Sequence, residues 1–145
     1  MGLTDTALRP QSGGPGRGAR WSPNVAKVLI IEDNAANMTL ATFLLQSAGY
    51  SVLSATDAEA GLTLARNEQP DLILMDIQLP GMDGFQATLL LKRDEATRAI
   101  PVIALTSLAM KGDEERIRAA GFDGYIAKPM RYQEFLTTIA AKLPQ

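Results

Sequence analysis

The sequence predicts an α/β protein with a doubly wound, parallel five-stranded sheet in three layers. The first observation is that strand-like and helix-like segments alternate from Lys27 onward, in five pairs; this alternation is typical of a (βα)₅ fold. The second is that the strongest strand segments are continuous apolar runs, which favours strands buried on both faces of a parallel sheet. Right-handed crossovers would then place helices on both faces.

Each predicted strand is short. Three apolar runs predict buried strands at Val28–Ile31, Leu72–Met75 and Val102–Leu105. A weaker, alternating run at Ser51–Ala55 predicts an edge strand, and Tyr125–Ala127 predicts a short last one.

The predicted helices carry apolar residues at helical spacing. These stripes are Leu40, Ala41, Leu44, Leu45 and Ala48; Ala58, Leu62 and Ala65; Phe85 and Leu89; Ile117 and Ala120; and Phe135, Leu136, Ile139, Ala140 and Leu143. Gly49 and Gly121 follow the first and fourth stripes, where a glycine commonly ends a helix. Gly81, Asp83 and Gly84 predict a turn into the third helix, with Asp83 as its cap or as a solvated charge.

Residues 1–26 differ from the rest of the chain. They are rich in glycine, contain three arginines and show no apolar period, which predicts a flexible tail ahead of one domain at 27–143. The tail glycines follow no strand, so they do not match a dinucleotide-binding fingerprint. An inert leader and a basic patch that contacts a partner both remain open. Trp21, the only tryptophan, is expected outside the core.

Composition excludes several kinds of function. The chain has no cysteine and no histidine, and its net charge is −2. Disulfides, thiolate or imidazole metal sites and a phosphohistidine on this chain are therefore excluded, and no basic field for nucleic acid is expected. No apolar run is long enough to span a membrane, and no secretory signal precedes the domain, so a cytoplasmic protein without membrane contact is predicted.

Chemically active residues follow four of the predicted strands. Glu32-Asp33 follows the first, Asp76 the third, Thr106-Ser107 the fourth and Lys128-Pro129 the fifth. Taken singly, each is an ordinary residue where a strand meets solvent. Because the carboxyl ends of parallel strands meet at one edge, where ligands bind in this fold class, together they predict a site.

The chemistry of this set favours a divalent cation and a phosphoryl group. Three clustered carboxylates repel one another, and Mg²⁺ prefers a few carboxylate oxygens together with water and phosphate. A carboxylate beside such an ion can attack phosphorus and form an acyl phosphate. Lys128 and Thr106 would then bind the phosphoryl oxygens.

The residues in this order resemble the receiver (response-regulator) family across Lys27–Leu143. The stretches Met75–Gly81 and Ala127–Pro129 fit that family as well. The resemblance implies the flavodoxin-like strand order 2-1-3-4-5. It also implies that Asp76 is the phosphoacceptor.

Further roles are implied by the same resemblance. Asp33, Asp76 and the main-chain carbonyl of Gln78 would bind Mg²⁺, and Glu32 would act mostly through a bound water. Thr106 and Tyr125 would form a switch pair. A cis peptide is expected between Lys128 and Pro129. Without the resemblance, Tyr125 would be read as a half-buried ring with a solvated hydroxyl.

In function, the chain is similar to single-domain receivers related to cell-cycle and phosphorelay regulators. These take a phosphoryl group from a histidine kinase or a histidine phosphotransferase protein and are not metabolic enzymes. Output would pass to a downstream protein through the face formed by the fourth helix, fifth strand and fifth helix, or by onward phosphotransfer. A monomer or weak dimer is expected. The alternative is that the chain is a receiver excised from a hybrid histidine kinase.

Two other functions use the same architecture. An aspartyl-nucleophile phosphohydrolase places a second Asp two residues after the nucleophile as general acid and base, but Gln78 holds that position here. An FMN-binding protein needs a phosphate-cradling loop after the first strand, where Glu32-Asp33 would repel the phosphate. The charged run Glu114, Glu115, Arg116 and Arg118 predicts only a solvated helix face.

Overall fold

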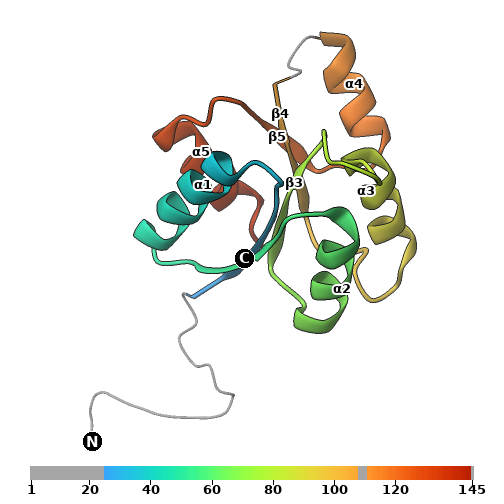
Figure 1. The fold of residues 1–145 in the computed structure, drawn as a ribbon, viewed down its shortest axis with the longest axis horizontal. Coiled ribbons are helices and arrows are strands. Elements are labelled where there is room, and N and C mark those ends of the chain that lie inside the picture. The colour runs from blue at the N-terminus through green and yellow to red at the C-terminus, as the bar shows by residue number, and fades with distance from the viewer. Residues whose placement is uncertain (1–24, 108–110, 145) are drawn as a thin grey trace, which may run out of the picture.

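A computed structural model of the chain describes residues 25–107 and 111–144 (Figure 1). Five strands alternate with five helices. In chain order they are β1 (Lys27–Ile31), α1 (Ala35–Ser47), β2 (Ser51–Ala55), α2 (Ala58–Glu68), β3 (Leu72–Asp76), α3 (Gly84–Arg93), β4 (Val102–Thr106), α4 (Lys111–Ala119), β5 (Gly124–Ala127) and α5 (Tyr132–Lys142). The predicted fold class is confirmed. The predictions for residues 1–24 of the tail, Trp21 among them, lie outside the described residues.

The five strands form one parallel sheet in the order β2-β1-β3-β4-β5. β2 is therefore an edge strand, as its alternating pattern predicted, and β5 is the other edge. Every residue of β3 and β4 is buried, as is most of β1. This explains why these three segments read as continuous apolar runs.

Helices cover both faces of the sheet, as Figure 1 shows: α1 and α5 lie on one side, and α2, α3 and α4 on the other. The two faces have separate apolar cores, because successive strand residues point to opposite sides. Phe135 of α5 and Leu45 of α1 are fully buried in the first core. Leu91 of α3 and Ile117 of α4 lie in the second.

The predicted helix boundaries follow ordinary capping chemistry. Asp83 caps α3, and its side chain accepts a hydrogen bond from the Gln86 N–H at 2.9 Å. The Gln86 side chain in turn accepts from the Asp83 N–H at 3.2 Å, which completes a capping box. Gly49 and Gly121 have φ angles of 93° and 103° after α1 and α4, a conformation that favours glycine at a helix end.

The prediction that the apolar stripes face the core is wrong for several of their residues. Leu40 and Leu89 have 39% and 42% of their surface exposed, and Ala48 and Ala140 are exposed as well. α1 instead buries Ala41, Leu44 and Leu45, and α3 buries Gly84, Ala87, Thr88 and Leu91. Both helices contain more apolar residues than one face needs, so spacing alone leaves the orientation of the helix undecided.

Among the described residues, no helix is long and apolar enough to cross a membrane.

Candidate functional site

The charged and hydroxyl residues predicted at the strand ends meet at the carboxyl edge of the sheet. Asp76 and Thr106 are the last residues of β3 and β4, while Glu32 and Lys128 directly follow β1 and β5. The parallel register carries these strands to the same edge: Asp76 pairs with Leu105, the residue before Thr106. The fold thus collects residues that are far apart in the sequence.

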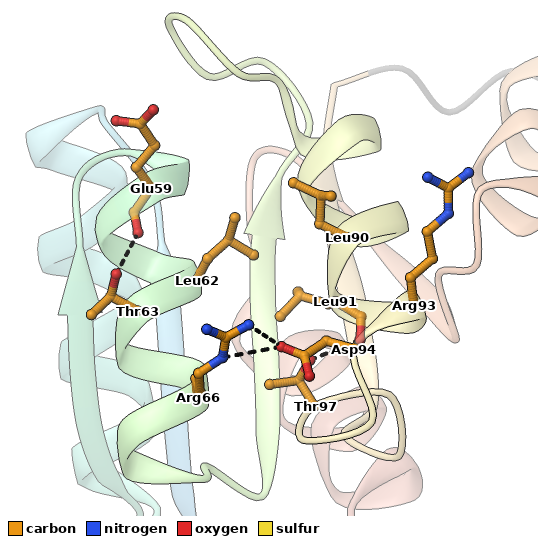
Figure 2. A pocket seen from close by; sticks show the side chains of 9 residues that line it. All are labelled: Glu59, Leu62, Thr63, Arg66, Leu90, Leu91, Arg93, Asp94 and Thr97. Atoms are coloured by element: carbon orange, nitrogen blue, oxygen red, sulfur yellow. Dashed lines mark hydrogen bonds and ion pairs between the residues drawn. The ribbon is translucent and has the colours of Figure 1, made fainter.

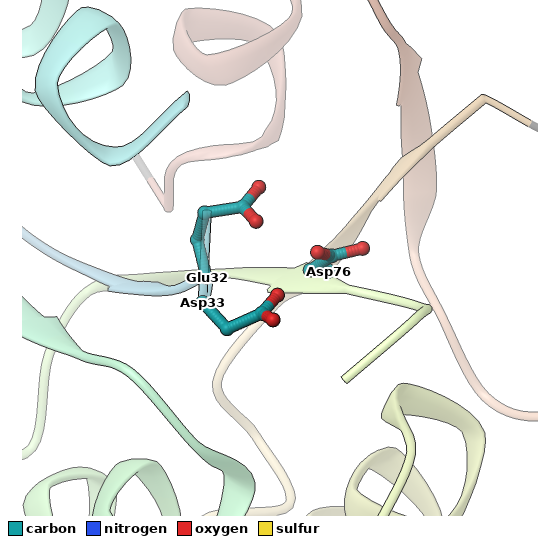
Figure 3. A group of neighbouring side chains, drawn as sticks. All are labelled: Glu32, Asp33 and Asp76. Atoms are coloured by element: carbon teal, nitrogen blue, oxygen red, sulfur yellow. The ribbon is translucent and has the colours of Figure 1, made fainter. Parts of the chain in front are cut away.

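Three carboxylates converge at this edge, as Figure 3 shows for Glu32, Asp33 and Asp76. Each residue offers a carboxylate oxygen, and these oxygens all lie within 4.8 Å of one another. Glu32 is fully buried, Asp76 is 3% exposed, and Asp33 is exposed. The cluster therefore has a closed inner side and an open outer side, which gives solutes a way to approach.

Lys128 is the cation of the cluster. Its Nζ lies 3.1 Å from Glu32 Oε1 and 3.2 Å from Asp76 Oδ2. One ammonium among three carboxylates leaves an excess of negative charge, and like charges at this separation repel. The lysine therefore organises the inner two carboxylates without neutralising the group.

Backbone N–H groups orient the two buried carboxylates. The Asn34 N–H donates to Glu32 Oε2 at 3.1 Å, and the Gln78 N–H donates to Asp76 Oδ1 at 3.0 Å. Asn34 also caps α1 through its side chain, which accepts from the Asn37 N–H. The loops after β1 and β3 are thereby tied to the carboxylates that they present.

Burial raises the pKa of the Glu32 carboxyl above its ordinary value, because the charged form loses its hydration. Its neighbour Asp76 raises this pKa further through a hydrogen bond and through like charge. The Asn34 N–H and the Lys128 ammonium lower this pKa, but the net shift is upward. Glu32 is thus a buried carboxyl in a place where a further positive charge would favour its ionised form.

Gly84 has a role that the sequence reading missed. It was predicted only as a turn residue, but it begins α3 against the backbone at the end of β3: a Cβ there would lie 2.4 Å from the Asp76 carbonyl oxygen and 2.8 Å from Ile77 Cα. The Gly84 N–H donates to the Ile77 carbonyl at 3.0 Å. Only a residue without a side chain permits this approach, which holds α3 beside Asp76.

The other residues implied by the resemblance lie on β4, on β5 and in the loops after β3 and β5. Thr106 is buried, and its carbonyl accepts from the Lys128 N–H at 2.8 Å. The peptide between Lys128 and Pro129 is cis, as expected. Gln78 is exposed in the loop after β3. Tyr125 is half-buried, and its hydroxyl donates to Glu114 Oε2 at 2.6 Å.

A groove of about 490 Å³ lies between α2 and α3, with Leu62, Leu90 and Leu91 among its lining residues (Figure 2). An ion pair between Arg66 and Asp94 crosses it. The groove shares no residue with the acidic cluster. It is therefore separate from the candidate site at the carboxyl edge of the sheet.

The acidic cluster fits a hard divalent cation. Its donors are carboxylate oxygens, it carries more negative charge than Lys128 balances, and its outer member Asp33 forms no hydrogen bond or ion pair with any described residue. A magnesium ion at such a site would retain waters and bind through few protein ligands. The donor set alone agrees with the predicted cofactor.

Comparison with known proteins gives one consistent result. A model of the response regulator receiver domain matches residues 28–140. The polar-differentiation response regulator DivK of Brucella ovis is 50% identical over 116 residues, which cover 80% of this chain and 94% of its own. DivK of Brucella anthropi is 49% identical over the same length.

Solved structures agree. The chemotaxis response regulator CheY4 of Vibrio cholerae is similar with a TM-score of 0.78 and 27% identity, over 81% of this chain and 98% of its own. The receiver domain of the sensor histidine kinase PA1611 from Pseudomonas aeruginosa has a TM-score of 0.75 and 36% identity, over 81% and 96%. That structure has a magnesium ion coordinated in its active-site cleft.

Proposed function

Because the chain belongs to the response regulator receiver family of two-component signalling, we propose that Asp76 accepts a phosphoryl group from a phosphohistidine and that this acts as a switch. The observation that carries the proposal is the position of Asp76. It ends a fully buried strand, and Lys128 holds one of its oxygens at 3.2 Å. A partner kinase or phosphotransferase protein would supply the phosphohistidine.

In the proposed reaction, Asp76, Lys128 and Thr106 have different roles. An Asp76 carboxylate oxygen attacks phosphorus, a P–O bond forms, and the P–N bond to the donor imidazole breaks, with the electron pair leaving on nitrogen. The Lys128 ammonium, already beside Asp76, stabilises the charge on the phosphoryl oxygens. Thr106 is buried at the end of the adjacent strand, and its hydroxyl would bind another of these oxygens.

Magnesium belongs to this proposal as the cofactor. Asp33, Asp76 and the main-chain carbonyl of Gln78 would hold it, with Glu32 acting through a water. When bound, the ion offsets the charge of the carboxylates and of the incoming phosphoryl group. The excess of carboxylates over the one ammonium of Lys128 supports this assignment.

The proposed domain spans residues 27–143 and acts as a switch, without chemistry on a metabolite. Its output is protein contact through α4, β5 and α5 or onward phosphotransfer, in the cytoplasm, from a monomer or weak dimer. Both a free-standing regulator and a receiver of a hybrid kinase agree with the relatives, which include a response regulator and a kinase receiver.

The test is phosphorylation by acetyl phosphate with magnesium, followed by intact-mass spectrometry. We expect one phosphoryl adduct on the native chain and none on Asp76→Asn. Asp57→Asn is the matched control: Asp57 caps α2 through its side chain, and Asn caps helices equally well, so this variant should be labelled normally. An undiminished adduct on Asp76→Asn would place the nucleophile elsewhere.

A further inference from the structure

One hydrogen bond joins β5 to α4 outside the acidic cluster. The Tyr125 hydroxyl donates to Glu114 Oε2 at 2.6 Å, and both residues are half-buried. Glu114 lies in the first turn of α4, so the sequence prediction that it belongs to a solvated face is wrong for this residue. A hydrogen bond to a carboxylate is stronger than one between neutral groups. The same bond raises the pKa of the Tyr125 hydroxyl, with smaller contributions from burial and the Glu114 charge.

Tyr125 lies on the same side of the sheet as Thr106. Tyr125 pairs in register with Ala104, which is two residues before Thr106 on β4. Because residues two apart on a strand point to one face, and directly paired residues do so as well, all three side chains face the same helices. The ring therefore has two directions on this face: toward α4, where Glu114 binds its hydroxyl, or along β4 toward Thr106. In this structure it takes the first.

The described side chains of α4, those of residues 113–119, make few other contacts with the rest of the domain. Within residues 113–119 of α4, Ile117 is the one buried side chain. The Arg116 guanidinium lies 4.7 Å from the centre of the Phe85 ring, which joins α4 to α3. The charge-assisted bond between Glu114 and Tyr125 is therefore one of the contacts that hold this helix against β5.

We propose that Glu114 holds Tyr125 in the resting position, so that this bond must break before the ring moves toward Thr106. The inference deepens the proposed function, because it names a residue that sets how readily the switch responds to phosphorylation. Glu114 is a positioning residue in this scheme, since it acts through Tyr125 and touches no reacting atom. Removing it raises the population of the competent state, and a ligand that selects this state then binds more tightly.

The test uses beryllofluoride with magnesium as a phosphoryl analogue, titrated by NMR or calorimetry. We expect Glu114→Ala to bind it roughly tenfold more tightly than the native chain, the ratio that corresponds to loss of one hydrogen bond to a charged group. Glu114→Gln, which keeps a neutral acceptor, should lie between the two. Glu115→Ala is the matched control, because it removes the same charge from an exposed neighbour and should bind as the native chain does.

Two further measurements separate positioning from a general structural role. The phenol pKa of Tyr125, followed by NMR, should fall toward its ordinary value in Glu114→Ala and stay raised in Glu115→Ala. In a Tyr125→Phe background, Glu114→Ala should have no further effect on analogue binding. If the native chain binds the analogue and Glu114→Ala binds it no more tightly, the role of Glu114 is refuted and the proposed function stands. A native chain that neither binds the analogue nor accepts phosphate would overturn the proposed function as well.

Discussion

Gly84 approaches the backbone of Asp76 so closely that a Cβ on the glycine would lie 2.4 Å from the aspartate carbonyl oxygen. The helix α3 therefore begins against the strand end that presents the proposed nucleophile. This contact connects the position of a helix to the position of a reacting carboxylate.

Gly84→Ala should therefore impair phosphorylation of Asp76 more than its effect on stability explains. The added methyl group meets backbone atoms, which can relieve the clash only by moving the end of β3 or the start of α3. Initial rates with acetyl phosphate and urea unfolding would be measured together. The control is Gly49→Ala, where a Cβ meets nothing within 4 Å but φ is 93°. This substitution should destabilise the fold by about 1 kcal/mol and leave the rate unchanged. Equal rates in both variants would contradict the prediction.

Lys128→Met should destabilise the fold by about 2 kcal/mol in the absence of metal, because the buried Glu32 carboxylate loses its ionic partner. The Glu32→Gln substitution should recover part of that loss, since an uncharged side chain needs no counterion. Urea unfolding of both single variants and the double variant gives the coupling free energy. Lys142→Met, at an exposed position of α5, is the control. Additive effects would show that the ion pair carries no stability.

Asp33→Asn should weaken magnesium binding by about tenfold or more, as loss of a direct ligand costs at least as much as loss of an outer partner. Calorimetric titration without any phosphodonor measures this directly. Asp57→Asn removes the same charge away from the cluster and should bind magnesium like the native chain. If both variants bind alike, Asp33 is not a ligand.

The Asp94 carboxyl should titrate below its ordinary pKa of 3.8, chiefly because the Arg66 side chain donates hydrogen bonds to it. A lowered folded pKa stabilises the fold above the unfolded pKa, and this contribution is lost as the pH falls through the folded value. Carboxyl ¹³C NMR should show the pKa rising in Arg66→Gln. In Arg93→Gln, which also lines the groove, it should stay low.

Deletion of residues 1–24 should leave both folding and phosphorylation of Asp76 intact. The first strand begins at Lys27, and the family model matches from residue 28. Circular dichroism and the acetyl phosphate assay would be applied to the shortened chain. Unfolding or loss of the adduct would show that the proposed domain boundary is wrong.

The sequence by itself was enough to predict the architecture and the gathering of charged residues at one edge of the sheet. Runs such as Leu72–Met75 are apolar because both faces of the strand are covered, and this pattern survives in the sequence. Parallel strands end at a common edge, so Glu32, Asp76 and Lys128 could be placed together before any distance was known.

Other features were decided only by the tertiary structure. Leu40 and Leu89 are apolar yet exposed, because the rotation of a helix depends on what packs against it. Gly84 resembles a turn residue until its distance from Asp76 is measured. Glu114 resembles any surface acid until Tyr125 is found beside it. Local patterns record which residues avoid water, but a contact between two elements depends on their relative placement, which no single segment encodes.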